Sequence, residues 1–435
     1  MFNLFTEHRV NATNEQAINN AYKYWRLRVM YSMYIGYAIF YFTRKGFIFI
    51  LPQLMNDLHF TKSEIGLFGT IFYFTYGVSK FIFGMVSDKS NPRYFMAFGL
   101  IMTGITNILF GFSSSLVVLL CLWFVNAVFQ GWGWPPCAKY LTHWFSQKER
   151  GLWWGLWNTS HLAGSIVVPL LAGLIASYWG WRSAMVICGI CAILVGIFLL
   201  NRLCGTPEEM GLPPIEIYKN DNPDNNAVES KRLPTNVILK KYILTNKYLW
   251  LLALSYMLVY FIQTTFVDWG ALYLTQKGYS LISADSCLSF FEAGGFGGSL
   301  AAGIWSDKIF KGRRGPINIL FCLSIFIFVL LFWLMPSPSY SLHALTAFLV
   351  GFFVFGPQML LGVAAAELSY REAAGTATGF LALFAYTGAA FSGYPIGLMV
   401  QLHGWAGFFI AMCVCSIAST LLLLPLWPVT SAAKN

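Results

Sequence analysis

The sequence predicts an all-α membrane protein in which twelve transmembrane helices form two six-helix repeats. Hydrophobic residues make up 57% of the 435 residues and charged residues only 11%, whereas about one quarter of a soluble domain is charged. The mean hydropathy is +0.60. The apolar residues gather in runs that are close to the roughly 20 residues needed to cross a bilayer as a helix. Short motifs of the first half also recur in the second half.

The predicted spans are separated by short polar breaks. They fall at roughly 27–53, 65–86, 94–113, 115–141, 152–178, 182–202, 247–275, 283–304, 317–336, 341–366, 374–402 and 405–427. Lysine and arginine concentrate in the N-terminal tail and in the loops after even-numbered spans, and the opposite loops are nearly bare of them. The positive-inside rule then puts both termini in the cytoplasm.

Changes in composition predict five parts of the chain. Residues 1–24 are polar, so we expect a cytoplasmic tail without a secretory signal. Residues 25–202 and 247–428 would form the two six-helix bundles. Residues 203–246 between them are rich in Pro, Asn, Asp, Glu and Lys, which is typical of a partly disordered cytoplasmic linker. Residues 429–435 would be the cytoplasmic C-terminal tail.

The two halves repeat each other. The motif Gly-Met-Val-Ser-Asp-Lys at 84–89 returns as Gly-Ile-Trp-Ser-Asp-Lys at 303–308, and a Gly-Trp pair at Gly180 and again at Gly404 opens the sixth helix of each half. Recurrence at matching positions favours internal duplication. Two parallel six-helix repeats with such loops describe the major facilitator architecture, in which substrate binds near mid-membrane between the halves.

Two adjacent cations, Arg44 and Lys45, lie well inside the first predicted span. A charge at this depth is costly and usually faces a bundle interior or a watery cavity. On a helix Tyr37, Tyr41 and Arg44 share one face, and Lys45 is turned about 100° away. We therefore expect Arg44 to face a cavity and bind a substrate anion, while Lys45 has a structural role. A second ion pair is the alternative for Arg44.

Carboxylates in the second half supply the opposite charge. Asp268 and Glu292 fall within the seventh and eighth spans. An ionised carboxylate without a partner would be costly in hydrocarbon, so we expect Lys45 to pair with one or both of them. Asp88 and Asp307 of the repeated loops complete the predicted structural or gating ion pairs.

Aromatic and polar residues near these charges are further candidates for substrate binding. A guanidinium fork matches two phosphate oxygens, and aromatic rings add flat walls and hydroxyl donors. These candidates are Tyr37, Tyr41, Tyr76, Lys80, Trp134, Asn158, His161, Tyr260, Gln263 and Tyr386. Asn158, His161 and Ser165 at i, i+3 and i+7 would form a polar stripe on one helix face. The alternatives are ordinary packing for the aromatic residues, a satisfied bundle histidine for His161, and snorkelling for Lys80.

Other classes of function have little support in the sequence. The nine cysteines lie mostly within apolar runs without metal-ligand spacing, so we interpret them as core residues. The net charge of +10 could suggest nucleic-acid binding, but no basic stretch outside the predicted membrane carries interleaved aromatic residues. We find no nucleophile–base pair and expect no enzyme activity, no metal and no cofactor. The glycines between 294 and 298 more simply permit close helix packing.

Several longer motifs are shared with a known family. They are Tyr41-Phe-Thr-Arg-Lys45, Tyr76-Gly-Val-Ser-Lys80, Gly131-Trp-Gly-Trp-Pro-Pro-Cys137, Trp157-Asn158, Val267-Asp-Trp-Gly270 and Glu292-Ala-Gly-Gly295. Together they resemble the organophosphate:phosphate antiporter family of the major facilitator superfamily. The similarity covers nearly the whole chain except the tail and the linker, and the second half looks closest to the hexose-phosphate type.

The resemblance implies that a cation on span 1 and a second on span 7 hold the phosphate, and Arg44 matches the first. The second is expected five residues before Asp268, where this chain has Gln263. An amide can donate a hydrogen bond but adds no charge, so this departure puts phosphate affinity or the exchange mechanism in doubt. Lys80 or His161 could compensate.

We therefore expect a secondary transporter that exchanges a sugar phosphate, above all glucose 6-phosphate, for inorganic phosphate by alternating access. It would act as a monomer in a bacterial inner membrane, with the endoplasmic reticulum as the alternative. One alternative function is a sugar-phosphate sensor of the same fold, which Gln263 favours. The other is a proton-coupled transporter of another small solute that uses Asp268 and Glu292.

Overall fold

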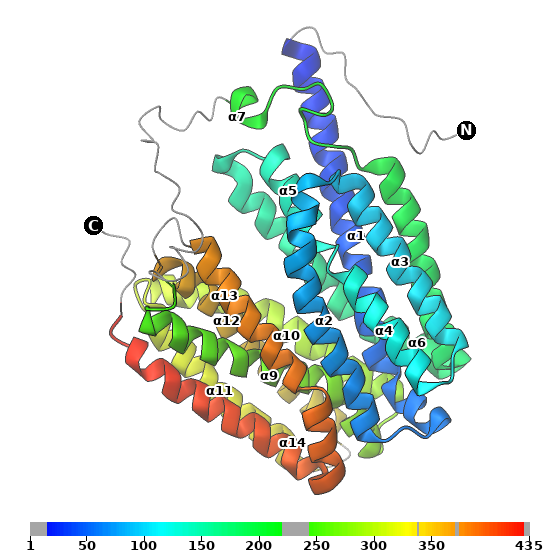
Figure 1. The fold of residues 1–435 in the computed structure, drawn as a ribbon. Coiled ribbons are helices and arrows are strands. Elements are labelled where there is room, and N and C mark those ends of the chain that lie inside the picture. The colour runs from blue at the N-terminus through cyan, green and yellow to red at the C-terminus, as the bar shows by residue number, and fades with distance from the viewer. Residues whose placement is uncertain (1–14, 220–242, 337–338, 370–373, 430–435) are drawn as a thin grey trace. The chain divides into compact units, whose positions relative to one another are not determined.

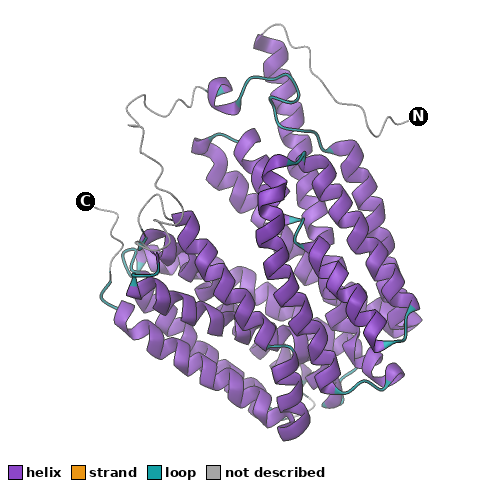
Figure 2. Ribbon diagram, in the orientation of Figure 1, coloured by secondary structure: helices purple, strands orange, loops and turns teal. Residues whose placement is uncertain are grey.

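The computed structural model describes residues 15–219, 243–336, 339–369 and 374–429. In this part of the chain every regular element is a helix, as Figure 2 shows. The elements are α1 (Glu15–Leu58), α2 (Lys62–Lys89), α3 (Pro92–Phe112), α4 (Leu116–Gln130), α5 (Trp134–Trp144), α6 (Gln147–Arg202), α7 (Ile215–Tyr218), α9 (Lys247–Gln276), α10 (Leu281–Lys308), α11 (Arg314–Leu334), α12 (Tyr340–Glu367), α13 (Ala374–Phe391), α14 (Tyr394–Leu423) and the 3-10 helix η3 (Leu424–Leu426). They are labelled in Figure 1. The predicted all-α class is confirmed.

Short polar residues begin several of these helices. The side chain of Asn91 accepts a hydrogen bond from the backbone N–H of Arg93, and Pro92 follows it at the first position of α3. Asn246 caps α9 in the same way, and the hydroxyl of Ser280 caps α10. Such caps satisfy backbone N–H groups that the first turn of a helix leaves unpaired. Polar residues at the breaks between apolar runs therefore also serve as N-terminal caps of the helices that follow.

Eight segments of the described residues are long and apolar enough to cross a membrane. Two of them, Leu152–Arg202 and Ala377–Leu426, contain 51 and 50 residues, more than twice the roughly 20 that one crossing needs. The first is interrupted at Gly180, with φ at 80°, and the second at Gly404, with φ at 66°. Residues with a side chain are strained at such φ angles, which explains glycine in both Gly-Trp pairs. The count of twelve spans stays a prediction.

The contacts within the chain divide it into two compact units. The first unit comprises residues 1–47, 75–168 and 178–230, and the second comprises 48–74, 169–177 and 231–435. The boundaries therefore cut through α1, α2 and α6, so that one segment of each helix groups with the second unit. The five-part division predicted from composition stays a prediction.

The core of the first unit includes the start of the expected linker. Cys204, Met210, Leu212 and Ile215 are buried and join the hydrophobic cluster built by α1, α3, α5 and α6. The hydroxyl of Tyr140 donates to the carbonyl of Cys204 at 2.7 Å. The remainder of that segment, residues 220–242, lies outside the described residues. Composition does not predict that the start of this segment packs in the core, because its few apolar side chains are spread among polar ones.

Close contact between α10 and α12 organises the second unit. A Cβ atom at Gly294 would overlap the carbonyl oxygen of Phe348, and one at Gly298 would overlap that of Phe352. On α12, Gly351 meets the backbone of Phe291 in the same manner. Small residues let helix backbones approach closely in membranes. The prediction that glycines of this segment serve close helix packing is confirmed for Gly294, Gly295 and Gly298, whereas Gly297 makes only an ordinary contact.

Gly298→Ala should destabilise the second unit, because the added methyl group would overlap the Phe352 carbonyl. Overpacking of this kind costs about 1–3 kcal/mol, measurable as a lower aggregation temperature in detergent. Gly297→Ala is the matched control, since a methyl group there meets only the Phe352 ring, at 3.7 Å. Equal aggregation temperatures for the two variants would contradict this packing.

Candidate functional site

Arg44 lies over aromatic rings of the first unit. Its guanidinium carbon is 4.2 Å from the centroid of the Tyr76 ring and 5.4 Å from that of Tyr41. The Nζ atom of Lys45 is 5.8 Å from the Tyr41 centroid. A cation is attracted to the negative face of an aromatic ring at such distances. Both cations therefore lie near Tyr41, although helical spacing turns their Cα positions apart.

Lys80 of α2 belongs to the same group. Its Nζ atom is 4.9 Å from the centroid of the Trp134 ring and 5.9 Å from that of Tyr76. Tyr76 therefore has Arg44 over its ring and Lys80 near it, and Trp134 at the start of α5 supplies a further ring. We call Arg44, Lys45 and Lys80 with Tyr41, Tyr76 and Trp134 the cation cluster.

His161 of α6 borders the cation cluster. Its ring centroid is 5.8 Å from that of Tyr41, and it is hydrogen-bonded to the backbone of Asn158. Tyr37 packs against Tyr41 at 5.8 Å and against Trp157 at 4.8 Å between centroids. These contacts join α1 to α6, so the predicted residues Tyr37, Tyr41 and His161 do lie together.

The predicted polar stripe on α6 is uneven. The side chain of Asn158 is exposed, whereas Ser165 is 1% exposed and faces the interior. The two residues therefore differ in their access to a solute. Asn158 can reach a hydrophilic ligand, and Ser165 is positioned for helix packing.

The helices of the first unit carry basic residues but almost no acidic ones. The sequence has no Asp or Glu within 16–56, 65–87, 89–148 or 150–207, although the cation cluster falls in this part of the chain. Positive charge in a low-dielectric environment interacts strongly with anions. Arginine can form two parallel hydrogen bonds to a phosphate, and lysine adds a point charge. The cluster therefore has the chemistry of an anion site with aromatic walls.

The predicted residues of the second unit form a separate polar group. The Nε2 of Gln358 donates to the Oε1 of Gln263 at 3.0 Å, so the residue at the expected cation position is held by an amide of α12. Tyr260 lies 4.8 Å from Tyr256 and 6.4 Å from Tyr386 between ring centroids. Gln358 and Tyr256 are not among the residues predicted from the sequence. Gln358 could have been found as a rare amide within an apolar span.

Asp268 is held by Tyr73 and Ser392, neither of which is predicted from the sequence. The hydroxyl of Tyr73 donates to its Oδ1 at 3.0 Å, and that of Ser392 to its Oδ2 at 3.4 Å. The indole N–H of Trp269 donates to the carbonyl of Ser392 at 2.8 Å. Glu292 on α10 is 1% exposed. The predicted pairing of Lys45 with these carboxylates stays a prediction.

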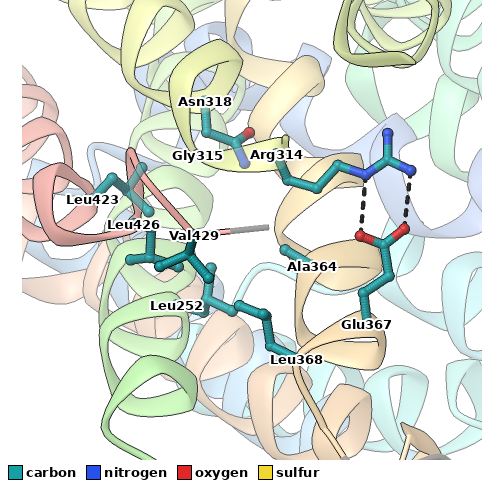
Figure 3. Close-up of a pocket in the computed structure, with 10 residues that line it drawn as sticks. All are labelled: Leu252, Arg314, Gly315, Asn318, Ala364, Glu367, Leu368, Leu423, Leu426 and Val429. Atoms are coloured by element: carbon teal, nitrogen blue, oxygen red, sulfur yellow. Dashed lines mark hydrogen bonds and ion pairs between the residues drawn. The ribbon is translucent and has the colours of Figure 1, made fainter. Parts of the chain in front are cut away.

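The second repeated loop ends in an ion-pair network. Arg314 binds Asp307 at 2.5 Å and Glu367 at 2.9 Å, and its Nε also donates to Glu367 at 3.2 Å. Figure 3 shows the Arg314–Glu367 pair at the edge of a pocket that is lined mainly by apolar side chains such as Leu252 and Leu426. The side chain of Asp88, predicted to act like Asp307 in the first half, lies outside the described residues.

Within the described residues no group of three or more His, Cys, Asp or Glu side chains could hold a metal ion. The nine cysteines are free thiols, and most are buried in helices. The candidate site therefore consists of the cation cluster with its aromatic walls, and separately of the amide and tyrosine group of the second unit.

Comparison with known proteins agrees with this chemistry. The profile of the Major Facilitator Superfamily matches residues 33–393. A probable hexose phosphate transport protein of Chlamydia pneumoniae is 48% identical over 436 residues, covering 98% of this chain and 96% of its own. The membrane sensor protein UhpC of Escherichia coli K12 is 48% identical over 415 residues, covering 95% of this chain and 94% of its own.

The chain belongs to the organophosphate:phosphate antiporter family of the major facilitator superfamily. The resemblance drawn from the motifs is thus confirmed, and the protein is a multi-pass membrane protein of a transporter family. The crystal structure of a bacterial homologue of the lysosomal transporter Spinster superposes with a TM-score of 0.75 at 15% identity, covering 92% of this chain and 95% of that one. This likeness confirms the fold.

Tyr76→Leu should weaken phosphate binding, because it removes the aromatic face beneath Arg44. A cation–π contact is worth about 0.5–2 kcal/mol, depending on desolvation, so we expect an increase in the phosphate Kd of about twofold to thirtyfold. Calorimetry on detergent-purified protein would measure it. Tyr76→Phe, which keeps the ring, should bind almost as the unchanged protein does. An equal loss in both variants would show that the hydroxyl matters and not the ring.

Proposed function

We propose that this member of the antiporter family exchanges a sugar phosphate, with glucose 6-phosphate as the expected cargo, for inorganic phosphate by alternating access. We further propose that it acts as a monomer in a bacterial inner membrane with both termini in the cytoplasm. The observation that carries the proposal is the cation cluster of the first unit, in helices that contain no carboxylate at membrane depth. The 48% identity to a probable hexose phosphate transport protein supports the choice of cargo.

A phosphate group suits the cation cluster because the phosphate is negatively charged and the arginine and lysine side chains are positively charged. Hydrogen bonds to charged groups contribute about 1.5–3 kcal/mol each, and the fork of Arg44 can make two of them to one phosphate. Lys80 adds a second cation from α2, held against Trp134. We propose that Arg44 and Lys80 together bind the phosphate that is common to both substrates.

The sugar requires a different kind of surface. Aromatic rings stack on the apolar faces of a hexose, and their hydroxyl groups bind its polar edge. Tyr37, Tyr41 and Trp134 offer such rings beside the cations. His161 and Asn158 can accept or donate hydrogen bonds to sugar hydroxyls. We propose that these five residues contact the sugar.

Exchange follows from the cost of closing an empty cationic site. When a cluster of positive charges is closed off from water, its electrostatic energy rises, and a bound anion offsets that rise. A ligand shifts a conformational equilibrium only by its differential affinity for the two states. Phosphate and sugar phosphate would both bind the closed state more tightly than the open state, whereas an empty site has no ligand to stabilise the closed state. The protein would then change state only when loaded.

Arg44→Ala should abolish the uptake of labelled glucose 6-phosphate into proteoliposomes loaded with phosphate, because it removes the only side chain of the cluster that can hold phosphate bidentately. We expect a fall of about 100-fold or more, the equivalent of two charged hydrogen bonds. Lys80→Ala should weaken uptake less, since it removes a point charge.

Arg202→Ala is the matched control for the loss of an arginine, because the side chain of Arg202 packs over Phe198, at 5.9 Å from its ring centroid, and lies outside the cation cluster. It should retain uptake. Full uptake by Arg44→Ala would refute the proposed phosphate site. Displacement by glycerol 3-phosphate as efficient as by glucose 6-phosphate would refute the proposed cargo and leave the site intact.

A sugar-phosphate sensor is the second candidate. One observation favours it: the position where the family resemblance expects a second cation is Gln263, and the amide of Gln358 holds its oxygen. A neutral amide pair binds an anion less strongly than a guanidinium does. The 48% identity to a membrane sensor protein is consistent with this candidate.

Gln263→Arg distinguishes the two candidates. In a sensor, the unchanged protein should bind labelled glucose 6-phosphate saturably without transporting it, and Gln263→Arg should gain phosphate affinity and measurable uptake. Gln263→Met, which removes the amide without adding charge, is the control. Robust uptake by the unchanged protein in proteoliposomes would exclude the sensor.

A further inference from the structure

A carboxyl group near the start of α10 is buried without a hydrogen-bond partner. Asp285 is 0% exposed. In the described part of the chain neither of its carboxyl oxygens has a hydrogen-bond partner. Nearly all buried polar groups in proteins are hydrogen-bonded, so a carboxyl with two unsatisfied oxygens needs a physical explanation. The ion pairs and the substrate site described above do not involve Asp285.

The carboxyl of Asp285 packs against the backbone of α6 within the second unit. A Cβ atom at Gly173 would overlap the Oδ2 atom of Asp285 and lie 3.1 Å from its Cγ. Glycine is therefore needed at 173 to make room for the carboxyl. The segment 169–177 that supplies this contact has no titratable side chain. Gln53 of α1, which donates to the carbonyl of Ala176 at 2.9 Å, is neutral as well.

Titratable groups on the other helices of the second unit are engaged elsewhere. Asp268 of α9 binds Tyr73 and Ser392. The Nδ1 of His343 on α12 contacts the hydroxyl of Tyr279 at 3.1 Å. Glu292 lies seven residues further along α10. None of the ion pairs found among the described residues involves Asp285.

An ionised carboxylate in such surroundings is far more costly than a neutral carboxyl group. Charge in an apolar interior loses its hydration, and here neither a cation nor a hydrogen-bond donor replaces the lost water. A buried acid in this position binds a proton and neutralises. Contact with water would reverse the balance, because hydration stabilises the charged form.

We propose that Asp285 is a proton-binding site, and that its protonated form is required for α10 to pack against residues 169–177. Packing takes one proton from water, and separation of the two segments returns it to water. Any conformational change that opens this contact is thereby linked to proton release. The site is distinct from the cation cluster, and the inference holds whichever solute the protein carries.

Infrared spectroscopy of the detergent-purified protein tests protonation directly. At neutral pH the unchanged protein should show the carbonyl stretch of a protonated carboxyl group, and Asp285→Asn should lose that component. Asp57→Asn is the matched control, because Asp57 is exposed, and it should leave the component unchanged. A spectrum of Asp285→Asn identical to that of the unchanged protein in this region would overturn the proposal.

The pH dependence of stability is a second readout. If the folded state keeps a proton that the unfolded state releases, stability falls as pH rises above the ordinary carboxyl range. The melting temperature of the unchanged protein should therefore decrease as the pH rises from about 5 to about 8. The melting temperature of Asp285→Asn should decrease by a few degrees less over the same range. Asp285→Ser provides a second neutral variant if Asp285→Asn does not fold. The same slope in the unchanged and neutral proteins would overturn the proposal, and neither readout depends on transport.

Discussion

Positive charge held among aromatic rings, in helix segments whose sequence has no Asp or Glu near the cations, is the interaction on which the proposed site depends. Arg44 lies over Tyr76, and Lys80 lies over Trp134. The rings lower the cost of keeping cations in an apolar environment, because the negative face of an aromatic ring attracts a cation. The cluster therefore keeps a net attraction for anions. A phosphate brings the charge that the helices of the first unit do not supply.

In the second unit, the structure depends on the close approach of the backbones of α10 and α12. Gly294, Gly298 and Gly351 bring α10 and α12 together at distances that no larger residue allows. Glu292 and Asp285 lie on the same helix, α10, and are buried. Close-packed side chains and backbone leave little room for gradual displacement. The buried carboxyl of Asp285 against Gly173 is one such close-packed contact.

Part of the site could be predicted from the sequence, and part could not. Helical spacing and the shared motifs were sufficient to select Tyr41, Arg44 and Lys80, because charged residues within apolar runs are few. They could not predict that Gln358 binds Gln263 or that Tyr73 binds Asp268, since these partners are 95 and 195 residues apart in the chain. Spacing along a helix gives the face of a residue but not its neighbour on another helix.

The sequence by itself was sufficient for the all-helical membrane class, which composition and the length of the apolar runs indicate, and for the repeated motifs of the two halves. It also placed Arg44, Lys45 and Lys80 within apolar runs. Only the tertiary structure decided which ring lies under which cation, that Cys204 and Ile215 join the core, and that Asp285 is enclosed against Gly173. The physical reason is that burial and partnership depend on helices that are distant in the chain. Their side chains meet only when close packing has fixed the direction in which each one points.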